Sequence, residues 1–421
     1  MDDNDLALVV TRLLPVPVIE RLAKKHGLIT RRRVVEIVPL VWGLVLASLT
    51  TTNSSLAAWR RFIINLTGWN LRARSSFYDR LTPELTRLFK DLLLRALLAN
   101  RRSTTSSHWL EPALSQLDSV LAIDSSVINL RDDLRSAWKA CAKARSALKL
   151  HAVVNVLDFQ LHRVQLSSQK AHDILGVSRV ASWARGKLLL MDLGYYSFDV
   201  FETIDQSGGY FLSRMKSSTN PIIIEDLHRG AGRLKKLKGL RVRRAAKKVS
   251  RRQLDVRVRL SSGLECRAVG LRNEEEDTWH WYLTNLPVAS YPAEYIGEIY
   301  RLRWQVELVF KQLKSQESLD VQTSTMKHRV ELKMWVSLLG YVLAGRLCER
   351  MRLRHEGEFP VWRALEALKI LGAELAREVC RDYIRPARSL GSRLVAMSCD
   401  PNVSRRRAYS GLAMTCDDSQ L

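Results

Sequence analysis

The sequence predicts a mixed α/β fold with helical regions on both sides of its central part. Apolar residues recur at helical spacing through most of the first hundred residues and again towards the end of the chain. Between these regions, β-branched and apolar segments have the pattern of strands, and a basic, strand-rich stretch interrupts them. With 421 residues, of which 46% are hydrophobic, the chain is long enough for two or three folding units, each with a core.

Residues 1–105 are predicted to form a helical domain. The apolar run 37–49 contains Pro39 and is too short to cross a bilayer, so we expect a buried helix there. Further helices are expected from Leu56 and after Thr82, which precedes a proline and an acid as at many helix starts. Short helices with several arginines are typical of a helix-turn-helix DNA-binding domain, although a packing domain with a solvated basic face has the same pattern. The arginines concerned are Arg60, Arg61, Arg72, Arg74 and Arg80.

The polar run 101–107 marks a domain boundary, after which residues 117–216 have the pattern of an α/β core. A buried strand is expected over 119–130, although Asp124 lies in its middle, where an unpartnered carboxylate is costly. The later predicted elements are a hairpin over 148–157 and 161–166, a short helix over 172–184, and strands over 186–192 and 209–216. The fourth strand ends in Asp192. Strands and acids in this order resemble an RNase H-like fold.

Residues 217–290 are predicted to form a basic insertion that is rich in strands. The window from Arg229 to Arg252 holds twelve Lys or Arg and no acid, which is half of the chain's net charge of +24. Clustered cations without counter-acids repel one another, so phosphate contact is favoured over a merely solvated face. Alternating patterns of strands follow over 255–260, 264–271 and 278–286. The basic residues expected to contact DNA are Arg243, Arg244, Lys247 and Lys248.

The charge and cysteine content indicate the partner and the compartment. A strong positive charge favours nucleic acid, and the sequence lacks the basic amphipathic helix or lipidation signal of a protein that binds an anionic membrane. The acidic start, Met1 to Asp5, lacks the positive flank of a signal peptide, so a cytoplasmic, nucleoid-associated protein is expected. Six scattered cysteines argue against a zinc site or a disulfide framework, and we expect them to be buried thiols.

Residues 296–317 are predicted to form an amphipathic helix, within a second part of the core over 291–350. Five of its apolar residues share one face: Leu302, Val306, Val309, Phe310 and Leu313. An adjoining face carries one phenol, one carboxylate and two cations: Tyr300, Arg303, Glu307 and Lys314. Taken alone, this row is equally consistent with an ordinary helix stabilised by an Arg303 and Glu307 pair. Further helices are expected over 330–351 and 362–381, and a C-terminal helical region and tail over 351–421.

Three carboxylates have the setting of a metal site: Asp124 and Asp192 on strands, and Glu307 on the helix after the insertion. Hard oxygen donors without a nearby set of His or Cys suit Mg²⁺ or Mn²⁺ rather than zinc. Two such ions activate a water or a 3′-hydroxyl and stabilise the leaving oxygen at a phosphodiester. For each acid by itself, a solvated or ion-paired structural carboxylate is the favoured explanation.

The spacing of the four polar residues on the predicted helix resembles that of a known family. Tyr300 is followed after two residues by Arg303, after three more by Glu307 and after six more by Lys314, which resembles the signature of DDE transposases of the insertion sequence 4 family. Four further blocks, in the family's order, extend this resemblance over residues 119 to 345: Ala122–Ser125, Lys149–His151, Asp192–Tyr195 and Tyr282–Pro287.

The resemblance implies site residues and partners. It makes Asp124, Asp192 and Glu307 the catalytic, metal-binding triad. It assigns contacts with DNA to Tyr300, Arg303, Lys314, Lys149 and His151. Some relatives stack a flipped base on a tryptophan of the insertion, for which Trp279 and Trp281 are candidates, although core packing is the favoured role for at least one of them. The implied partners are double-stranded DNA, at transposon ends and target, and a second copy of the chain in the synaptic complex.

The leading functional hypothesis is therefore a cut-and-paste DNA transposase that binds terminal inverted repeats and joins the 3′-hydroxyl to target DNA. A plain metal-dependent nuclease would use the same triad. A non-catalytic DNA-binding regulator derived from a transposase is the third hypothesis, and the presence of all three acids weighs against it.

Overall fold

The computed structural model describes residues 4–29, 36–50, 55–67, 77–100, 114, 116–141, 145–227, 237–273, 275–315, 319, 324–355, 357 and 359–382. The chain divides into two compact units, which we describe one at a time. The first unit comprises residues 1–105, 127–148 and 310–421, and the second comprises residues 106–126 and 149–309. Arg72, Arg74, the predicted boundary at 101–107 and the C-terminal tail lie outside the described residues.

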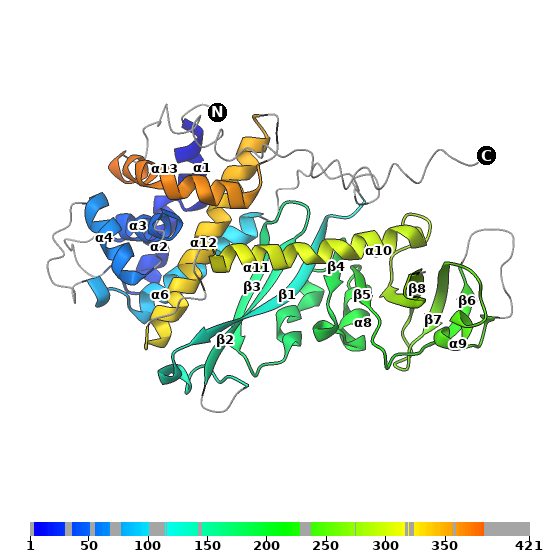
Figure 1. Ribbon diagram of the computed structural model, residues 1–421. Helices are drawn as coiled ribbons and strands as arrows, with labels where there is room; N and C mark the ends of the chain where they lie inside the picture. Colours follow the sequence, from blue (N-terminus) through cyan, green and yellow to red (C-terminus); the bar gives the residue numbers. More distant parts are fainter. Residues whose placement is uncertain are drawn as a thin grey trace. The chain divides into compact units, whose positions relative to one another are not determined.

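The first unit consists mainly of helices, as the sequence predicts (Figure 1). The apolar run forms α3, and Trp42 and Leu44 to Leu46 are completely buried there. Thr82 caps α6, because its Oγ1 accepts a hydrogen bond from the Leu85 amide at 3.3 Å. The helices are α1 (Asn4–Leu13), α2 (Val16–Lys25), α3 (Ile37–Thr50), α4 (Leu56–Thr67), α6 (Pro83–Asn100), α12 (Lys327–Arg352) and α13 (Val361–Asp382).

Two long helices close the core of this unit. α12 packs against α6 and α3, and α13 packs against α3. The Thr86 hydroxyl donates to the His328 carbonyl oxygen at 3.0 Å, which ties α6 to the start of α12. Gly340 of α12 lies so close to α3 that an added Cβ atom would be 2.8 Å from Ser48 Oγ. The two predicted helices near the C-terminus are confirmed.

A nine-stranded sheet dominates the central part of the chain, in the order β3-β2-β1-β4-β5-β9-β8-β7-β6. The predicted strands are confirmed as β1 (Ser119–Leu130), β2 (Ser146–Asn155), β3 (Leu161–Ser168), β4 (Lys187–Met191) and β5 (Tyr210–Arg214). β4 pairs in parallel with both β1 and β5. The fold is therefore mixed α/β around one large sheet.

The strands of the predicted insertion extend the same sheet. β9 pairs antiparallel with β5, and β8, β7 and β6 follow in antiparallel pairs. The bounds are β6 (Ile222–Asp226), β7 (Gln253–Arg259), β8 (Glu265–Asn273) and β9 (Thr278–Thr284). The sequence patterns did not predict β6. A short helix, α9 (Val242–Ala246), lies between β6 and β7 in the chain.

The helix predicted over 172–184 is confirmed only in part. The segment forms two short 3₁₀ turns, η2 (Asp173–Val177) and η3 (Val180–Ser182). Arg179, between them, has φ of 55°, a left-handed conformation that an α-helix cannot contain. An α-helix that was not predicted, α8 (Phe198–Gln206), packs against β5.

The segment predicted as one helix over 296–317 is helical but divided. α10 (Ala293–Arg301) and α11 (Gln305–Ser315) are joined by one 3₁₀ turn, η6 (Leu302–Trp304). The Leu302 amide donates to the Ile299 carbonyl, and this i to i−3 bond tightens the turn without ending the helical path. α10 packs against β7 and β8, and η6 packs against β4. All the apolar residues predicted to share a face are buried: Leu302, Val306, Val309, Phe310 and Leu313.

The hydropathy of the helices and the burial of the cysteines can both be compared with the expectations from the sequence. Among the described helices, none combines the length and the apolar character needed to cross a bilayer. Cys266 and Cys348 are buried thiols as expected, whereas Cys141 is exposed, so that expectation is wrong for Cys141.

Candidate active site

The register between β1 and β4 brings two aspartates together. Ile123 of β1 pairs with Met191 of β4, and the strands are parallel, so Asp124 within β1 lies beside Asp192, the residue directly after β4. Side chains alternate between the two faces of a strand. Leu121, Ile123 and Met191 belong to the core on one face of the sheet, which places Asp124 on the other face.

Arg303 of η6 contacts two of the three predicted acids. Its Nη1 is 3.5 Å from Asp124 Oδ2, and its Nη2 donates to Glu307 Oε1 at 3.0 Å. The Arg303 side chain is only 8% exposed, against 22% for Asp124 and 40% for Glu307. One buried guanidinium therefore holds a carboxylate of the sheet and a carboxylate of the helix.

The charges at this site perturb the pKa of Asp124. Burial raises that pKa to about 6, and the neighbouring Asp192 and Glu307 carboxylates act in the same direction. The Ser125 amide, which donates to Asp124 Oδ1 at 2.7 Å, and the Arg303 guanidinium oppose the increase. The other two predicted acids, Asp192 and Glu307, are therefore near enough to act on Asp124 electrostatically.

Tyr300, to which the resemblance assigns DNA contact, is buried beside the end of β4. Its hydroxyl donates to the Met191 carbonyl oxygen at 3.4 Å, and its ring lies 5.3 Å from that of Tyr282. Burial raises the pKa of Tyr300 to about 12. The contact with Met191 fixes α10 next to the residue that precedes Asp192.

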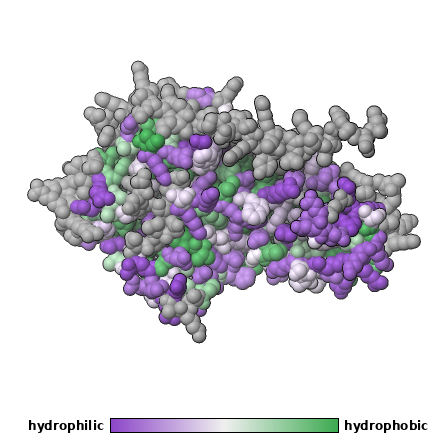
Figure 2. Space-filling model, viewed as in Figure 1, coloured by the Kyte–Doolittle hydropathy of each residue, from purple (hydrophilic) through white to green (hydrophobic). Residues whose placement is uncertain are grey.

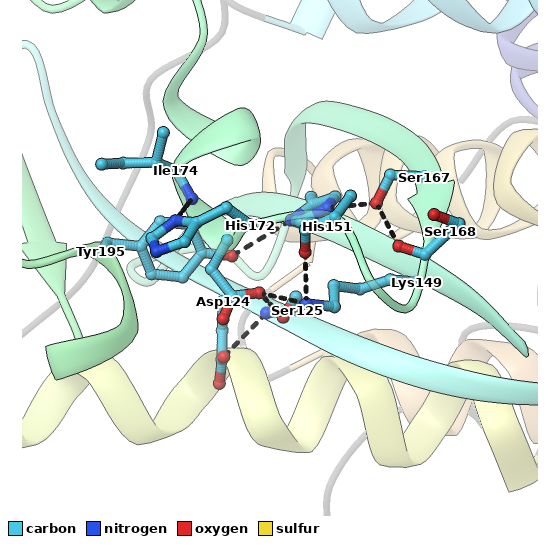
Figure 3. A network of polar contacts seen from close by, with 11 residues as sticks. Asp124, Ser125, Lys149, His151, Ser167, Ser168, His172, Ile174 and Tyr195 are labelled. Carbon is cyan, nitrogen blue, oxygen red and sulfur yellow. Dashed lines mark hydrogen bonds and ion pairs between the residues drawn. The ribbon is translucent and has the colours of Figure 1, made fainter. Parts of the chain in front are cut away.

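Lys149 and His151 are also interior residues, 9% and 2% exposed (Figure 3). Lys149 Nζ donates to Asp173 Oδ1 and to the Ala171 carbonyl oxygen, both at 2.9 Å. The Ser125 hydroxyl donates to the same Asp173 oxygen at 2.9 Å. Lys149 and His151, to which the resemblance assigns DNA contact, are thus buried and bonded within the protein next to Asp124.

His151 lies between two hydroxyl groups. Its Nε2 is 2.8 Å from Ser167 Oγ, and its Nδ1 is 3.4 Å from the hydroxyl oxygen of Tyr195. Burial lowers the pKa of His151 to about 4. The imidazole is therefore neutral near pH 7 and links β2 to the turn that follows Asp192.

Lys314 lies in the first unit. Its Nζ donates to the Val127 carbonyl oxygen at 3.1 Å, which joins α11 to β1 within that unit.

The basic residues of the insertion divide into structural and exposed groups. Arg243 Nη2 donates to the Ser217 carbonyl oxygen at 2.8 Å, so this side chain holds a loop. The other three predicted DNA contacts are exposed: Arg244, Lys247 and Lys248. Figure 2 shows a predominantly hydrophilic surface over this end of the sheet.

Trp279 and Trp281 stack on each other, with ring centroids 5.6 Å apart. Trp281 is 6% exposed and belongs to the core, while Trp279 is partly buried against it. Gly270 of β8 leaves space for the pair, since an added Cβ atom would lie 2.8 Å from Trp281. Core packing therefore accounts for Trp281.

The chemistry of the three acids fits a hard divalent cation, since all three offer carboxylate oxygens. Among the residues that the structure describes, no three His, Cys, Asp or Glu side chains are grouped closely enough to hold a metal ion. Instead, the Arg303 guanidinium supplies the positive charge between Asp124 and Glu307. The Nε atom of Arg303 is buried and makes no hydrogen bond with the described residues. The Arg303 guanidinium thus balances the negative charge of Asp124 and Glu307, which a divalent metal cation can also balance.

Comparison with known proteins decides the family. Residues 115–343 match the family model described as "Transposase DDE domain". The chain belongs to this family. The match contains both strands with the aspartates and the helix with Glu307, and with the relatives below it identifies the chain as a DNA transposase.

Several transposases are similar over much of their length. The transposase of insertion sequence element IS231B from Bacillus thuringiensis subsp. berliner is 21% identical over 377 residues, which is 79% of this chain and 77% of that protein. The putative transposase InsL of element IS186A from Escherichia coli strain K12 is 41% identical over 61 residues, 14% of this chain and 16% of that protein. A chain from a piggyBac transposase synaptic complex with hairpin DNA has the same fold, with a TM-score of 0.50 and 8% identity over 95% of this chain and 86% of that one.

The structure also places two residues next to this transposase's candidate site that were not predicted as site residues, Asp173 and Ser125. Asp173 lies at the start of the segment predicted as a helix, and Ser125 is the last residue of the block that contains Asp124. Burial acts to raise the pKa of Asp173, but hydrogen bonds from Lys149 and Ser125 outweigh it, so that pKa is lowered overall. A polar residue directly after an acid within an apolar strand is the one sequence signal that marks Ser125.

Proposed function

We propose that this transposase binds the terminal inverted repeats of an insertion sequence, cuts at the element ends and joins the freed 3′-hydroxyls to target DNA by a cut-and-paste route. Asp124, Asp192 and Glu307 are the proposed catalytic residues. The observation that carries this proposal is the parallel pairing of Ile123 with Met191, which makes the two aspartates neighbours, together with the contact of Arg303 with Asp124 and Glu307.

The proposed cofactor is Mg²⁺ or Mn²⁺, held by the three carboxylates. When bound, such ions supply activation of the attacking oxygen and stabilisation of the leaving oxygen at the phosphodiester. Arg303 balances the acids in the state described, and we propose that it turns to a DNA phosphate when cations take over that charge. Tyr300 keeps the end of β4 in place, which positions Asp192.

Two finer assignments follow from the same residues. The strand order β3-β2-β1-β4-β5 supports an RNase H-like core formed by residues 117–216 and 291–350, with residues 217–290 as the insertion. The spacing from Tyr300 to Lys314 supports membership of the insertion sequence 4 family.

We further propose which regions contact DNA. The exposed Arg244, Lys247 and Lys248 supply phosphate contacts, and Arg303 and Lys314 join them when DNA is bound. The helical domain over 1–105 recognises the repeat, and two copies of the chain pair the two ends at the nucleoid. Trp279 is the candidate for stacking on a flipped base. An unchanged signal from a fluorescent base analogue next to the cleavage site in the Trp279→Ala protein would remove that role.

A strand-joining assay tests the function. A duplex that ends in the element's inverted repeat is incubated with the protein, Mg²⁺ and a second, unrelated duplex. Covalent joining of the repeat's 3′ end to the second duplex is the expected result, and it is lost in the Asp124→Asn protein. Cleavage without joining would indicate a plain nuclease, and specific binding without cleavage would indicate a regulator.

A further inference from the structure

Asp173 of η2 lies against both segments that carry the active-site aspartates. On one side, its Oδ1 accepts a hydrogen bond from the Ser125 hydroxyl at 2.9 Å. On the other side, Gly194 follows Asp192 by two residues, and a Cβ atom added there would lie 3.2 Å from Asp173 Oδ2. One carboxylate therefore touches the residue after Asp124 and the turn after Asp192.

The alternation of side chains explains how Asp173 acts on the site without belonging to it. Asp124 points to the face of the sheet where Arg303 lies, so Ser125 points to the opposite face. There its hydroxyl meets Asp173, while its amide donates to Asp124 Oδ1 at 2.7 Å. Fixing the Ser125 side chain thus fixes the amide that orients the Asp124 carboxylate.

Lys149 fixes Asp173 in turn. Its Nζ donates to Asp173 Oδ1 at 2.9 Å, and its side chain is 11% exposed, against 32% for Asp173. A second bond, from Lys149 Nζ to the Ala171 carbonyl oxygen at 2.9 Å, holds the backbone two residues before Asp173. The carboxylate is therefore anchored to β2, independently of Asp124 and Asp192.

The glycine at position 194 fits the same arrangement. At 3.2 Å, a Cβ atom is closer to a carboxylate oxygen than ordinary van der Waals contact allows, so a side chain at position 194 would push Asp173 away. Displacing Asp173 would also stretch its bond with Ser125. The separation between the two segments is thus set by one carboxylate that is bonded on one side and closely packed on the other.

We propose that Asp173 is a positioning residue, which sets the relative placement of the Asp124 and Asp192 carboxylates through Ser125 and Gly194. The inference depends on the proposed role of these two aspartates in holding the divalent cation. Groups that orient metal ligands from behind typically change metal affinity 10- to 100-fold when they are removed.

The test measures Mn²⁺ binding directly, by the electron paramagnetic resonance signal of free Mn²⁺, together with the Mn²⁺ dependence of cleavage. We expect the Asp173→Ala protein to need about 10-fold more Mn²⁺ for half-saturation in both measurements. Asp173→Asn keeps an acceptor for the Ser125 hydroxyl and should lie closer to wild type than Asp173→Ala. Asp199→Asn, an exposed acid at the start of α8, is the matched control and should match wild type.

Two outcomes would overturn the proposal. One is a wild-type Mn²⁺ dependence in Asp173→Ala. The other is equal impairment of the Ala and Asn proteins together with an equal loss of thermal stability, which is the behaviour of an ordinary structural ion pair. If Asp173→Ala does not fold, Ser125→Ala replaces it. We expect that protein also to need about 10-fold more Mn²⁺ for half-saturation, and a wild-type Mn²⁺ dependence would overturn the proposal.

The Asp124→Asn protein, measured in parallel, separates this proposal from the proposed function. Wild-type cleavage and Mn²⁺ binding in Asp124→Asn would remove the catalytic role of Asp124 itself. Loss of both in Asp124→Asn, combined with wild-type behaviour in Asp173→Ala, would leave the catalytic role standing and remove only the role of Asp173.

Discussion

Ile123 of β1 pairs directly with Met191 of β4, and each of these two residues precedes an aspartate. Because the strands are parallel, the chain continues in the same direction from both, so Asp124 within β1 and Asp192 just after β4 lie side by side. Arg303 then links Asp124 to Glu307, which lies on α11. The acids lie 68 and 115 positions apart in the sequence and are brought together only by the fold.

The Arg303→Ala protein should depend on divalent cations for stability more than wild type does. Without the guanidinium, Asp124 and Glu307 lose their shared partner, at a cost of about 1 to 3 kcal/mol. A cation that binds the three acids stabilises the folded state and should recover this loss. Melting temperatures in EDTA and in excess Mg²⁺ check this, with Arg301→Ala as an exposed control. Equal Mg²⁺-induced increases in all three proteins would contradict the account.

His151 should make stability depend on pH below neutrality. Its folded pKa, about 4, is below the ordinary value of 6.5, so between these values the unfolded chain binds a proton that the folded chain does not. The stabilisation is therefore complete above pH 6.5 and is lost as the pH falls towards 4, by about 3 kcal/mol. Urea unfolding of wild type and His151→Gln at several pH values measures this, and the variant's curve should be flatter over that range. Parallel curves would contradict the assignment.

The Asp255 and Arg267 pair should contribute strongly to the sheet of the insertion. Two hydrogen bonds, at 2.6 and 2.8 Å, join the buried side chains, and Arg267 also donates to the Tyr291 carbonyl oxygen before α10. Removing one partner leaves a buried charge, so Asp255→Ala should cost about 3 to 5 kcal/mol. The Arg259 and Glu265 pair lies on the same two strands but is exposed, and Glu265→Ala should cost less than about 1 kcal/mol. Equal losses of the free energy of unfolding in urea would contradict the claim that burial makes the Asp255 and Arg267 pair the more important one.

The elements of this fold are largely predictable from local patterns, but their partners are not. The strand around Asp124 is marked by its β-branched residues, and the helix of Glu307 by apolar spacing that the packing confirms. The division of that helix at Leu302–Trp304 and the left-handed Arg179 depend on local geometry that residue types do not encode. Local patterns also carry no information on register, which is why the Ile123 and Met191 pairing emerges only in the structure.

The site shows the same limit. The family resemblance assigns DNA contact to Lys149, yet in the folded chain this side chain is buried and donates to the Asp173 carboxylate. Asp173 has no local feature that distinguishes it from a solvated acid. Its position becomes informative only when β1, β2 and the turn after β4 are assembled around it.

The most direct test of the account is the cleavage rate of a duplex with the element's inverted repeat, in Mg²⁺, for wild type, Glu307→Gln and the exposed control Glu294→Gln. The amide keeps the size of Glu307 but removes the charge that completes the three carboxylates, and a loss of several kcal/mol at the transition state corresponds to roughly a thousand-fold slower reaction. We expect that decrease for Glu307→Gln, with unchanged rates for Glu294→Gln. Cleavage by Glu307→Gln at the wild-type rate would contradict the assignment of Asp124, Asp192 and Glu307 as one catalytic site.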